Sequence, residues 1–365
     1  MEERASGRGS RGVLVLGGGI IGLSCARALS AAGADVTVLD PGETTARAGW
    51  AAGGMLAPLA EAEGPGLFLE MAQASLRSYP GFVAALESST GLHLGLSLDG
   101  KLLTAYDPAR ENELGDRIAA FGAAGAEAEW LDGAAVRRME PSLSQEVRGA
   151  VLLRGQGRVD NRRLSEALER DCRGRGVGFL TGRAGSLDLR HGAVTAVRTS
   201  EGHTLDRFES VVLAAGAWSG ALDGLPRPLD VRPVKGEMLA FAAPTPPLTR
   251  VATAGDRYLI PRETPSGPVV VVGATQEERG FDREVTRAGQ VSLEEGAVRL
   301  VPALGEAPVV ERWAGLRPGS ADGLPILGPD PEVPNLCYAT GHYRNGVLLA
   351  PYTADRIREW WEGRS

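Results

Sequence analysis

Hydrophobic positions near the start of the chain form short continuous runs separated by a segment with helical spacing. Residues 13–16 are an unbroken apolar run, which is typical of a strand buried on both faces of a parallel sheet. Residues 20–32 carry apolar side chains at helical spacing, and Gly33 suits the end of that helix. A second strand is expected at residues 35–40, so the chain opens with a βαβ unit.

Further along, hairpin signals lie between strand signals. Residues 99–100 (Asp-Gly) and 191–192 (His-Gly) each separate two strand-like segments, which predicts two hairpin turns. Residues 211–214 form a second buried-strand run, and alternating β-branched positions at 229–241 and 257–274 predict further strands. Helices are expected at residues 67–86, 134–139 (capped by Asp132), 162–173 and 348–361.

This interleaving predicts an α/β fold with a discontinuous nucleotide-binding domain, interrupted twice by an antiparallel α+β substrate domain. The expected nucleotide-binding segments are 11–85, 145–225 and 312–365, the substrate-binding segments are 86–144 and 226–311, and residues 1–10 form a flexible tail.

A glycine motif follows the first predicted strand. Residues 17–22 read GGGIIG and match GxGxxG between a strand and a helix. Gly17 permits a tight turn, Gly19 lets backbone N–H groups approach a pyrophosphate, and Gly22 lets the helix pack closely on the strand. Asp40 ends the next strand, where its carboxylate suits a ribose diol. The motif predicts a dinucleotide, but it fits NAD and FAD equally well.

Composition and charge exclude several classes of protein. The chain has 365 residues and a formal net charge of −7, without a basic block, which argues against a nucleic-acid partner. Its cysteines, Cys25, Cys172 and Cys337, lie far apart, as expected for buried thiols in a reducing compartment without a metal site. No apolar stretch has the length of a membrane span or the pattern of a signal peptide, so a cytoplasmic location is expected.

Several further segments occur in an order that resembles one family. They are AAGGML (51–56), VVLAAGAWS (211–219), PVKGE (233–237), WAGLRPG (313–319) with DGLP (322–325), and ATGHYRNGVLLAP (339–351). Together with GGGIIG they resemble the D-amino acid oxidase family of FAD-dependent oxidoreductases, most of all its glycine oxidase branch of thiamine biosynthesis. The resemblance extends from residue 12 to about residue 356.

The resemblance implies a Rossmann-like FAD-binding domain of the glutathione reductase type with an inserted substrate domain, and FAD held without a covalent bond. Arg317 would bind the substrate carboxylate, Tyr258 would add a phenolic hydrogen bond, and Arg344 would place positive charge near the reduced ring. Together with the glycine motif, the implied cofactor-binding residues are Gly17, Gly19, Ile20, Ile21, Gly22, Asp40, Pro41, Gly53, Gly54, Met55, Gly185 (matched by position alone), Gly216, His342, Tyr343, Arg344, Asn345, Gly346, Val347 and Leu348.

The implied reaction is the oxidative deamination of glycine and other small amino acids, such as sarcosine and small D-amino acids. Hydride passes to FAD, the imine hydrolyses to a 2-oxo acid and ammonia, and O₂ reoxidises the flavin to give H₂O₂; the glycine imine can instead supply thiazole assembly. The resemblance also implies a homo-oligomer. Three alternatives stay open: a D-amino acid or N-methyl amino acid dehydrogenase with an acceptor other than O₂, a flavin domain that acts on modified tRNA, and a non-catalytic flavin-binding scaffold.

Overall fold

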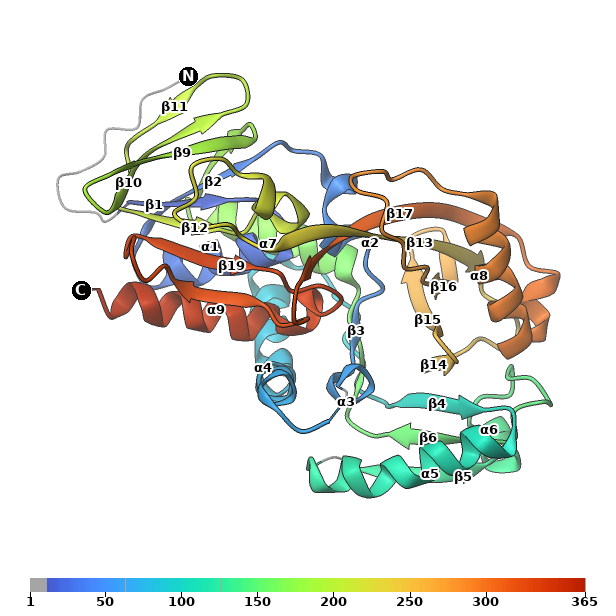
Figure 1. Cartoon of the computed structure of the whole chain (residues 1–365). Coiled ribbons are helices and arrows are strands. Elements are labelled where there is room, and N and C mark those ends of the chain that lie inside the picture. The colour runs from blue at the N-terminus through green and yellow to red at the C-terminus, as the bar shows by residue number, and fades with distance from the viewer. Residues whose placement is uncertain (1–11, 63, 126, 365) are drawn as a thin grey trace.

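Two large sheets lie at opposite ends of the molecule (Figure 1). The computed structural model describes residues 12–62, 64–125 and 127–364, so the tail expected at residues 1–10 lies outside the described residues. One sheet has six strands and the other eight. Two small sheets, one of three strands and one of two, accompany them.

The six-stranded sheet has the order β18-β19-β12-β1-β2-β8. Its strands run parallel except β18, which pairs antiparallel with β19 at the edge. The strands are β1 (Gly12–Leu16), β2 (Asp35–Asp40), β8 (Gly178–Thr181), β12 (Ser210–Leu213), β18 (Ile326–Pro329) and β19 (Leu336–Thr340). The helices beside this sheet are α1 (Ile20–Ala31), α4 (Leu67–Thr90), α7 (Asn161–Gly174) and α9 (Gly346–Glu362).

Alternate residues of β1 face opposite sides of this sheet. Val13 and Val15 pack with the helices, whereas Leu14 and Leu16 pack with the small sheet of β9 (Ala184–Arg190), β10 (Ala193–Thr199) and β11 (Thr204–Leu205). Both faces are therefore covered, which explains the unbroken apolar run and confirms the predicted βαβ opening.

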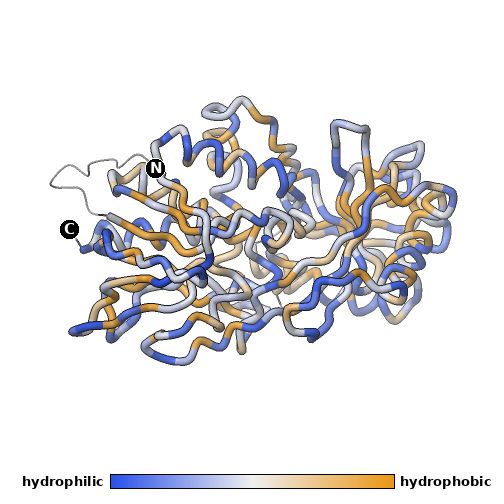
Figure 2. Tube along the Cα trace, turned by 90° about the horizontal axis from the view of Figure 1, so that it is seen from above, coloured by the Kyte–Doolittle hydropathy of each residue, from blue (hydrophilic) through white to orange (hydrophobic). Residues whose placement is uncertain are grey.

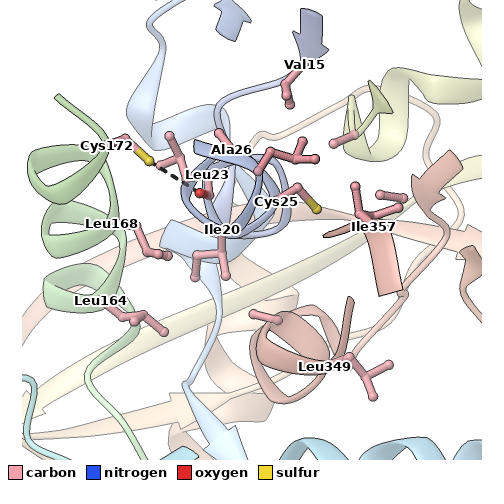
Figure 3. Close-up of a cluster of buried hydrophobic side chains, with 14 of the residues drawn as sticks. Val15, Ile20, Leu23, Cys25, Ala26, Leu164, Leu168, Cys172, Leu349 and Ile357 are labelled. Carbon is pink, nitrogen blue, oxygen red and sulfur yellow. Dashed lines mark hydrogen bonds between the residues drawn. The ribbon is translucent and has the colours of Figure 1, made fainter. Parts of the chain in front are cut away.

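Helix α1 lies at the centre of the helical layer, between α7 and α9 (Figure 3). Its side chains meet Leu168 of α7 and Ile357 of α9 in one buried cluster. Cys172 on α7 donates a hydrogen bond of 3.4 Å from Sγ to the Leu23 carbonyl. Cys25, Cys172 and Cys337 are all buried free thiols, as the sequence predicts.

The eight-stranded sheet has the order β17-β13-β16-β15-β14-β4-β6-β5, and its strands pair antiparallel except β14 with β4. The strands are β4 (Lys101–Ala105), β5 (Ala128–Asp132), β6 (Gly149–Leu153), β13 (Val231–Ala242), β14 (Val251–Ala254), β15 (Arg257–Thr264), β16 (Gly267–Gly273) and β17 (Val309–Ser320). A parallel sheet beside a mainly antiparallel sheet confirms the predicted fold class.

The two faces of the eight-stranded sheet have different neighbours. Leu239 and Leu259 pack with helix α8 (Arg287–Leu300) in one core cluster. Met238 and Tyr258, each one position earlier in its strand, belong to a separate cluster on the opposite face. The α8 face is a closed core, and the other face is free to form a site.

The remaining elements are short connectors and cover helices. They are η1 (Thr44–Ala46), α2 (Ala48–Ala51), β3 (Met55–Leu56), α3 (Pro58–Glu61), α5 (Pro108–Ala123), α6 (Gly133–Met139), β7 (Gly157–Arg158), η2 (Gly216–Ala221) and η3 (Pro302–Gly305). All the helices that the sequence predicts are present, as α1, α4, α6, α7 and α9. Helices α5 and α8 were not predicted.

The hairpin predicted at residues 191–192 is present, because β9 and β10 pair antiparallel across it and both turn residues have positive φ. The hairpin predicted at residues 99–100 is wrong. Strand β4 pairs with β6 and β14 instead. Leu96 and Leu98 pack against the core of the six-stranded sheet, so burial there outweighs local pairing with β4.

Two strands qualify the expected division into domains. Strands β6 and β17 belong to the eight-stranded sheet, although residues 145–225 and 312–365 were expected in the nucleotide-binding domain. The division into two domains stays a prediction. The sheet to which β6 and β17 belong would assign both strands to the substrate domain. Hydrophobic positions concentrate along the strands and hydrophilic ones along the outer loops (Figure 2). Within the described ranges, no helix has the length and apolar character needed to cross a membrane.

The contact between Gly22 and Gly17 yields a prediction about stability. A Cβ at Gly22 would lie closer than 3.0 Å to the backbone of Gly17, which a strand end and a helix hold in place. We expect Gly22→Ala to destabilise the fold by about 1–3 kcal/mol, seen as a thermal unfolding midpoint several degrees lower. The control is Gly115→Ala in α5, where a Cβ would meet open space and should stabilise by about 0.5–1 kcal/mol. Equal midpoints for the two variants would contradict this packing argument.

Candidate active site

One pocket extends from the turn after β1 to the inner face of β13 and β17. Its volume is about 1750 Å³ when the open mouth is included. The turn after β1, the end of β2 and the residues after β12 and β19 all contribute to it. These are carboxyl ends of parallel strands, which is where ligands bind in open α/β sheets.

The pocket brings together most of the site residues that the sequence predicts. Those that line it are Gly17, Gly19, Ile20, Ile21, Asp40, Pro41, Gly53, Gly54, Met55, Gly216, Tyr258, Arg317, His342, Tyr343, Arg344, Asn345, Gly346 and Val347. Three predicted residues lie outside the lining. Gly22 packs against Gly17, Leu348 is buried in the helical core, and Gly185 follows the lining residue Ala184 in β9.

The three glycines of the motif have separable roles. Gly17 has a φ of 113°, and a Cβ there would press on the backbone of Ala214 at the end of β12. The backbone of Gly17 leaves no room for a side chain at Gly22. At Gly19, the residue preceding α1, a Cβ would meet nothing within 4 Å. This open position at a helix N-terminus suits the close approach of a phosphate.

Asp40 lies at the end of β2 and accepts three hydrogen bonds. Its carboxylate accepts bonds from the N–H groups of Gly18 at 2.6 Å and Gly42 at 2.8 Å, and from Arg47 Nη2 at 2.8 Å. Burial alone would raise the pKa of this carboxyl, but Arg47 and the two N–H groups together lower it below its usual value. Asp40 is therefore an ionised acceptor at neutral pH.

The residues after β19 close the pocket beneath the N-terminus of α9. The His342 Nε2 and Thr353 Oγ1 atoms are 2.9 Å apart, and His342 is almost completely buried. Burial lowers the pKa of His342 to about 3, so its ring is neutral at physiological pH. Gly346 begins α9 at the pocket wall, where the helix dipole contributes partial positive charge.

Arg317 lies on β17 opposite Val234 of β13, and its guanidinium lies over Gly236, two positions further along β13. A Cβ on Gly236 of β13 would come closer than 3.0 Å to the Arg317 guanidinium. Arg317 Nη1 donates to the carbonyls of Lys235 and Thr275, both at 3.2 Å. Gly315, which pairs with Gly236, would likewise press a Cβ against Ala51. The guanidinium is thus held on the sheet surface inside the pocket.

Tyr258 stands beside Arg317 and depends on another glycine. A Cβ on Gly273 of β16 would lie closer than 3.0 Å to the Tyr258 ring and hydroxyl. Burial raises the pKa of the Tyr258 phenol, whereas the charge of Arg317 acts in the opposite direction. The phenol is neutral and can donate a hydrogen bond; its hydroxyl lies 3.9 Å from Met238 Sδ.

Charged side chains that the sequence reasoning missed surround the pocket. Glu61 lines it and pairs with Arg344 at 3.1 Å, so the predicted charge of Arg344 has a protein partner. Lys101 is almost completely buried beneath the lining residue Met55, with Nζ 3.7 Å from its Sδ. Burial lowers the pKa of Lys101 to about 8. No local sequence signal identifies these residues, because their neighbours come from distant segments.

A family comparison decides the class of the protein. The family model described as "FAD dependent oxidoreductase" (DAO) matches residues 12–360. The chain belongs to this family. FAD is therefore its cofactor, and the lining fits that group: Gly19 and Gly216 face open space, and Asp40 is an ionised acceptor next to the glycine turn.

The chain is similar to glycine oxidases over nearly its whole length. It is 35% identical to a glycine oxidase of Pseudomonas aeruginosa, covering 97% of this chain and 96% of that protein. It is 38% identical to the bifunctional protein ThiO/ThiG of a Nostoc species, covering 96% of this chain. The chain spans about half the length of such bifunctional relatives, covering 52% of that protein. The crystal structure of glycine oxidase from Bacillus cereus superimposes with a TM-score of 0.90 at 30% identity, covering 98% of this chain and 96% of that one.

The open position at Gly19 yields a prediction about the cofactor. We expect Gly19→Ala to weaken FAD binding by about tenfold or more, because a methyl group would occupy the space where phosphate oxygens meet backbone N–H groups. Fluorescence titration of the apoprotein with FAD measures this. Gly115→Ala is the control and should bind FAD normally. An unchanged dissociation constant for Gly19→Ala would place the pyrophosphate elsewhere.

Proposed function

We propose that this protein is an amino acid oxidase that acts on glycine and other small amino acids, including sarcosine and small D-amino acids. The observation that carries the proposal is the Arg317 guanidinium, held beside the neutral phenol of Tyr258 in the same pocket as the dinucleotide-binding turn. Full-length similarity to glycine oxidases supports it.

Arg317 is suited to hold a substrate by its carboxylate. Its Nη1 is directed to the carbonyls of Lys235 and Thr275, so a planar anion would meet the other nitrogens of the guanidinium, beside the Tyr258 hydroxyl. A guanidinium binds a carboxylate through parallel, charge-assisted hydrogen bonds that fix the orientation of the substrate. Tyr258 adds a neutral donor from β15, which β13 and β16 separate from β17 in the same sheet.

Apolar side chains also line this end of the pocket, beside the Glu61–Arg344 ion pair. Ala51, Met55 and Met238 line the pocket there, and they exclude water from the substrate Cα–H. When bound, FAD supplies the two-electron acceptor for that C–H bond and passes the electrons to O₂. The oxidation needs no base from the protein, provided that the substrate amine has already lost its proton to solvent. The neutral ring of His342 is therefore not required as a base.

The products follow from this chemistry. The imine hydrolyses to a 2-oxo acid and ammonia, or methylamine where the substrate is sarcosine, and O₂ is reduced to H₂O₂. We further propose that the glycine imine can supply thiazole assembly, which the fused relatives named ThiO/ThiG support. A homo-oligomer and a cytoplasmic location stay predictions.

An aerobic assay tests the proposal. Purified protein reconstituted with FAD is given glycine, sarcosine or D-alanine, and H₂O₂ is measured beside a sample without substrate. Peroxide production with at least one of them is expected. Dye reduction without O₂ consumption would instead favour a dehydrogenase. Neither signal with any of the three substrates would refute the proposed function.

Removing the carboxylate anchor tests its assigned role. We expect Arg317→Ala to lower kcat/KM for glycine by about 100-fold or more, since a buried charge-assisted interaction is lost, while the flavin absorbance of the purified protein persists. Arg312→Ala is the matched control: it lies on the same strand but pairs with Glu294 at the surface. Near-normal turnover in Arg317→Ala would remove the assignment.

A further inference from the structure

The segment from Ala48 to Met55, which contains α2, forms one wall of the pocket, and its other side faces a buried polar network. We propose that Asn161, Arg262 and Trp313 are positioning residues that fix this segment against FAD and thereby set the affinity and reduction potential of the bound flavin. We call these three side chains the carbonyl bracket. The proposal rests on the FAD cofactor of the family and not on the identity of the substrate.

The carbonyl bracket binds successive backbone carbonyls from behind. Asn161 Nδ2 donates to the carbonyls of Gly49 at 2.7 Å and Trp50 at 3.0 Å. Trp313 Nε1 donates to the Ala51 carbonyl at 2.9 Å.

Arg262 completes the bracket two residues further along, past Ala52. Its Nη2 donates to the Gly53 carbonyl at 3.2 Å and to Asn161 Oδ1 at 2.6 Å. The carbonyls of residues 49, 50, 51 and 53 are therefore all held by side chains of the bracket. Asn161 both donates and accepts, so it links Arg262 to the beginning of the segment.

The bracket joins the two halves of the fold. Asn161 is the first residue of α7, which packs beside the six-stranded sheet. Arg262 and Trp313 belong to β15 and β17 of the eight-stranded sheet. The exposed fractions are 0% for Asn161, 8% for Arg262 and 6% for Trp313, so these bonds lie in a low-dielectric interior. An unpaired polar group there is costly, which makes the arrangement specific.

The direction of the carbonyls determines what the pocket wall presents. In a trans peptide the C=O and the following N–H point in opposite directions. Because the Gly53 carbonyl is turned to Arg262, the N–H of Gly54 is turned away from the bracket, on the side of the segment that lines the pocket. Gly54 has a φ of 82°, and a Cβ there would press on the Val159 carbonyl. The wall therefore offers a fixed backbone donor.

The Gly54 N–H and the buried charge of Arg262 both act on the reduced state of the flavin. Preorganised N–H groups stabilise negative charge that develops during a reaction, and they need no reorganisation when it appears. The Arg262 guanidinium lies directly behind the segment and adds a positive charge. Both favour the reduced, anionic flavin over the oxidised one, so the bracket should raise the reduction potential.

The experiment compares three variants with a neighbouring control. Arg262→Met removes the charge and the donor. Asn161→Ala removes two carbonyl bonds and the acceptor of the bond from Arg262, but it leaves the charge. Arg262→Lys keeps the charge without the planar donor group. Glu263→Gln, at an exposed position next to Arg262, is the control. For each protein, FAD affinity is measured by fluorescence titration, and the midpoint potential is measured with reference dyes.

We expect Arg262→Met to bind FAD about tenfold more weakly and to bind the reduced form a further tenfold more weakly than the oxidised form. That second factor corresponds to a midpoint potential lowered by about 30 mV for a two-electron couple. Asn161→Ala should weaken FAD binding by a similar factor. Arg262→Lys should recover most of the potential, and Glu263→Gln should match the unchanged protein.

Unchanged affinity and potential in Arg262→Met and Asn161→Ala would overturn the proposal and leave the network a packing feature. If Arg262→Met does not fold, Asn161→Ala and Arg262→Lys decide by the same FAD titration, and normal FAD affinity in both would equally overturn it. These readouts use no amino acid. A failure of glycine oxidation with intact flavin properties therefore refutes the proposed function and not the bracket.

Discussion

The site depends on two paired glycines, each of which lets another residue pack directly against the backbone of its strand. Gly236 on β13 and Gly315 on β17 pair directly across the sheet. The space beside Gly236 is occupied by the Arg317 guanidinium, and the space beside Gly315 is occupied by Ala51. The space left by the two missing side chains, here called the glycine hollow, therefore admits both the proposed substrate anchor and the segment that forms the pocket wall. A side chain at either glycine would push one of them away.

The glycine hollow explains how two different sheets contribute to one pocket. The six-stranded sheet ends at the glycine turn and Asp40, which suit a dinucleotide. The inner face of the eight-stranded sheet carries Tyr258 and Arg317, which suit a small carboxylate. The segment from Ala48 to Met55 lies between them and contacts both. Positions that line the pocket alternate with positions that pack on α8, so the same strands build a rigid core and a site.

Local sequence patterns predicted those parts that local forces determine. The βαβ opening, the packing role of Gly22 and the capped helix α6 follow from neighbouring residues. Helices α5 and α8 also begin at side-chain caps, Asp107 and Thr286, so the signal that indicates α6 is present in them as well. The hairpin at residues 99–100 failed because distant packing outweighed the turn signal.

The environment of each predicted site residue could not be predicted, because it comes from contacts distant in sequence. The Arg317 guanidinium packs on Gly236, and the Tyr258 ring packs on Gly273. Arg344 forms an ion pair with Glu61. Family motifs indicated the residues, whereas only the fold supplies their partners.

A crystal structure of the protein with FAD and glycolate, the hydroxy analogue of glycine, tests the central claim most directly. We predict the glycolate carboxylate within hydrogen-bond distance of the Arg317 guanidinium and the FAD pyrophosphate against the turn that contains Gly19. A carboxylate bound away from Arg317, or FAD bound outside this pocket, would contradict the account.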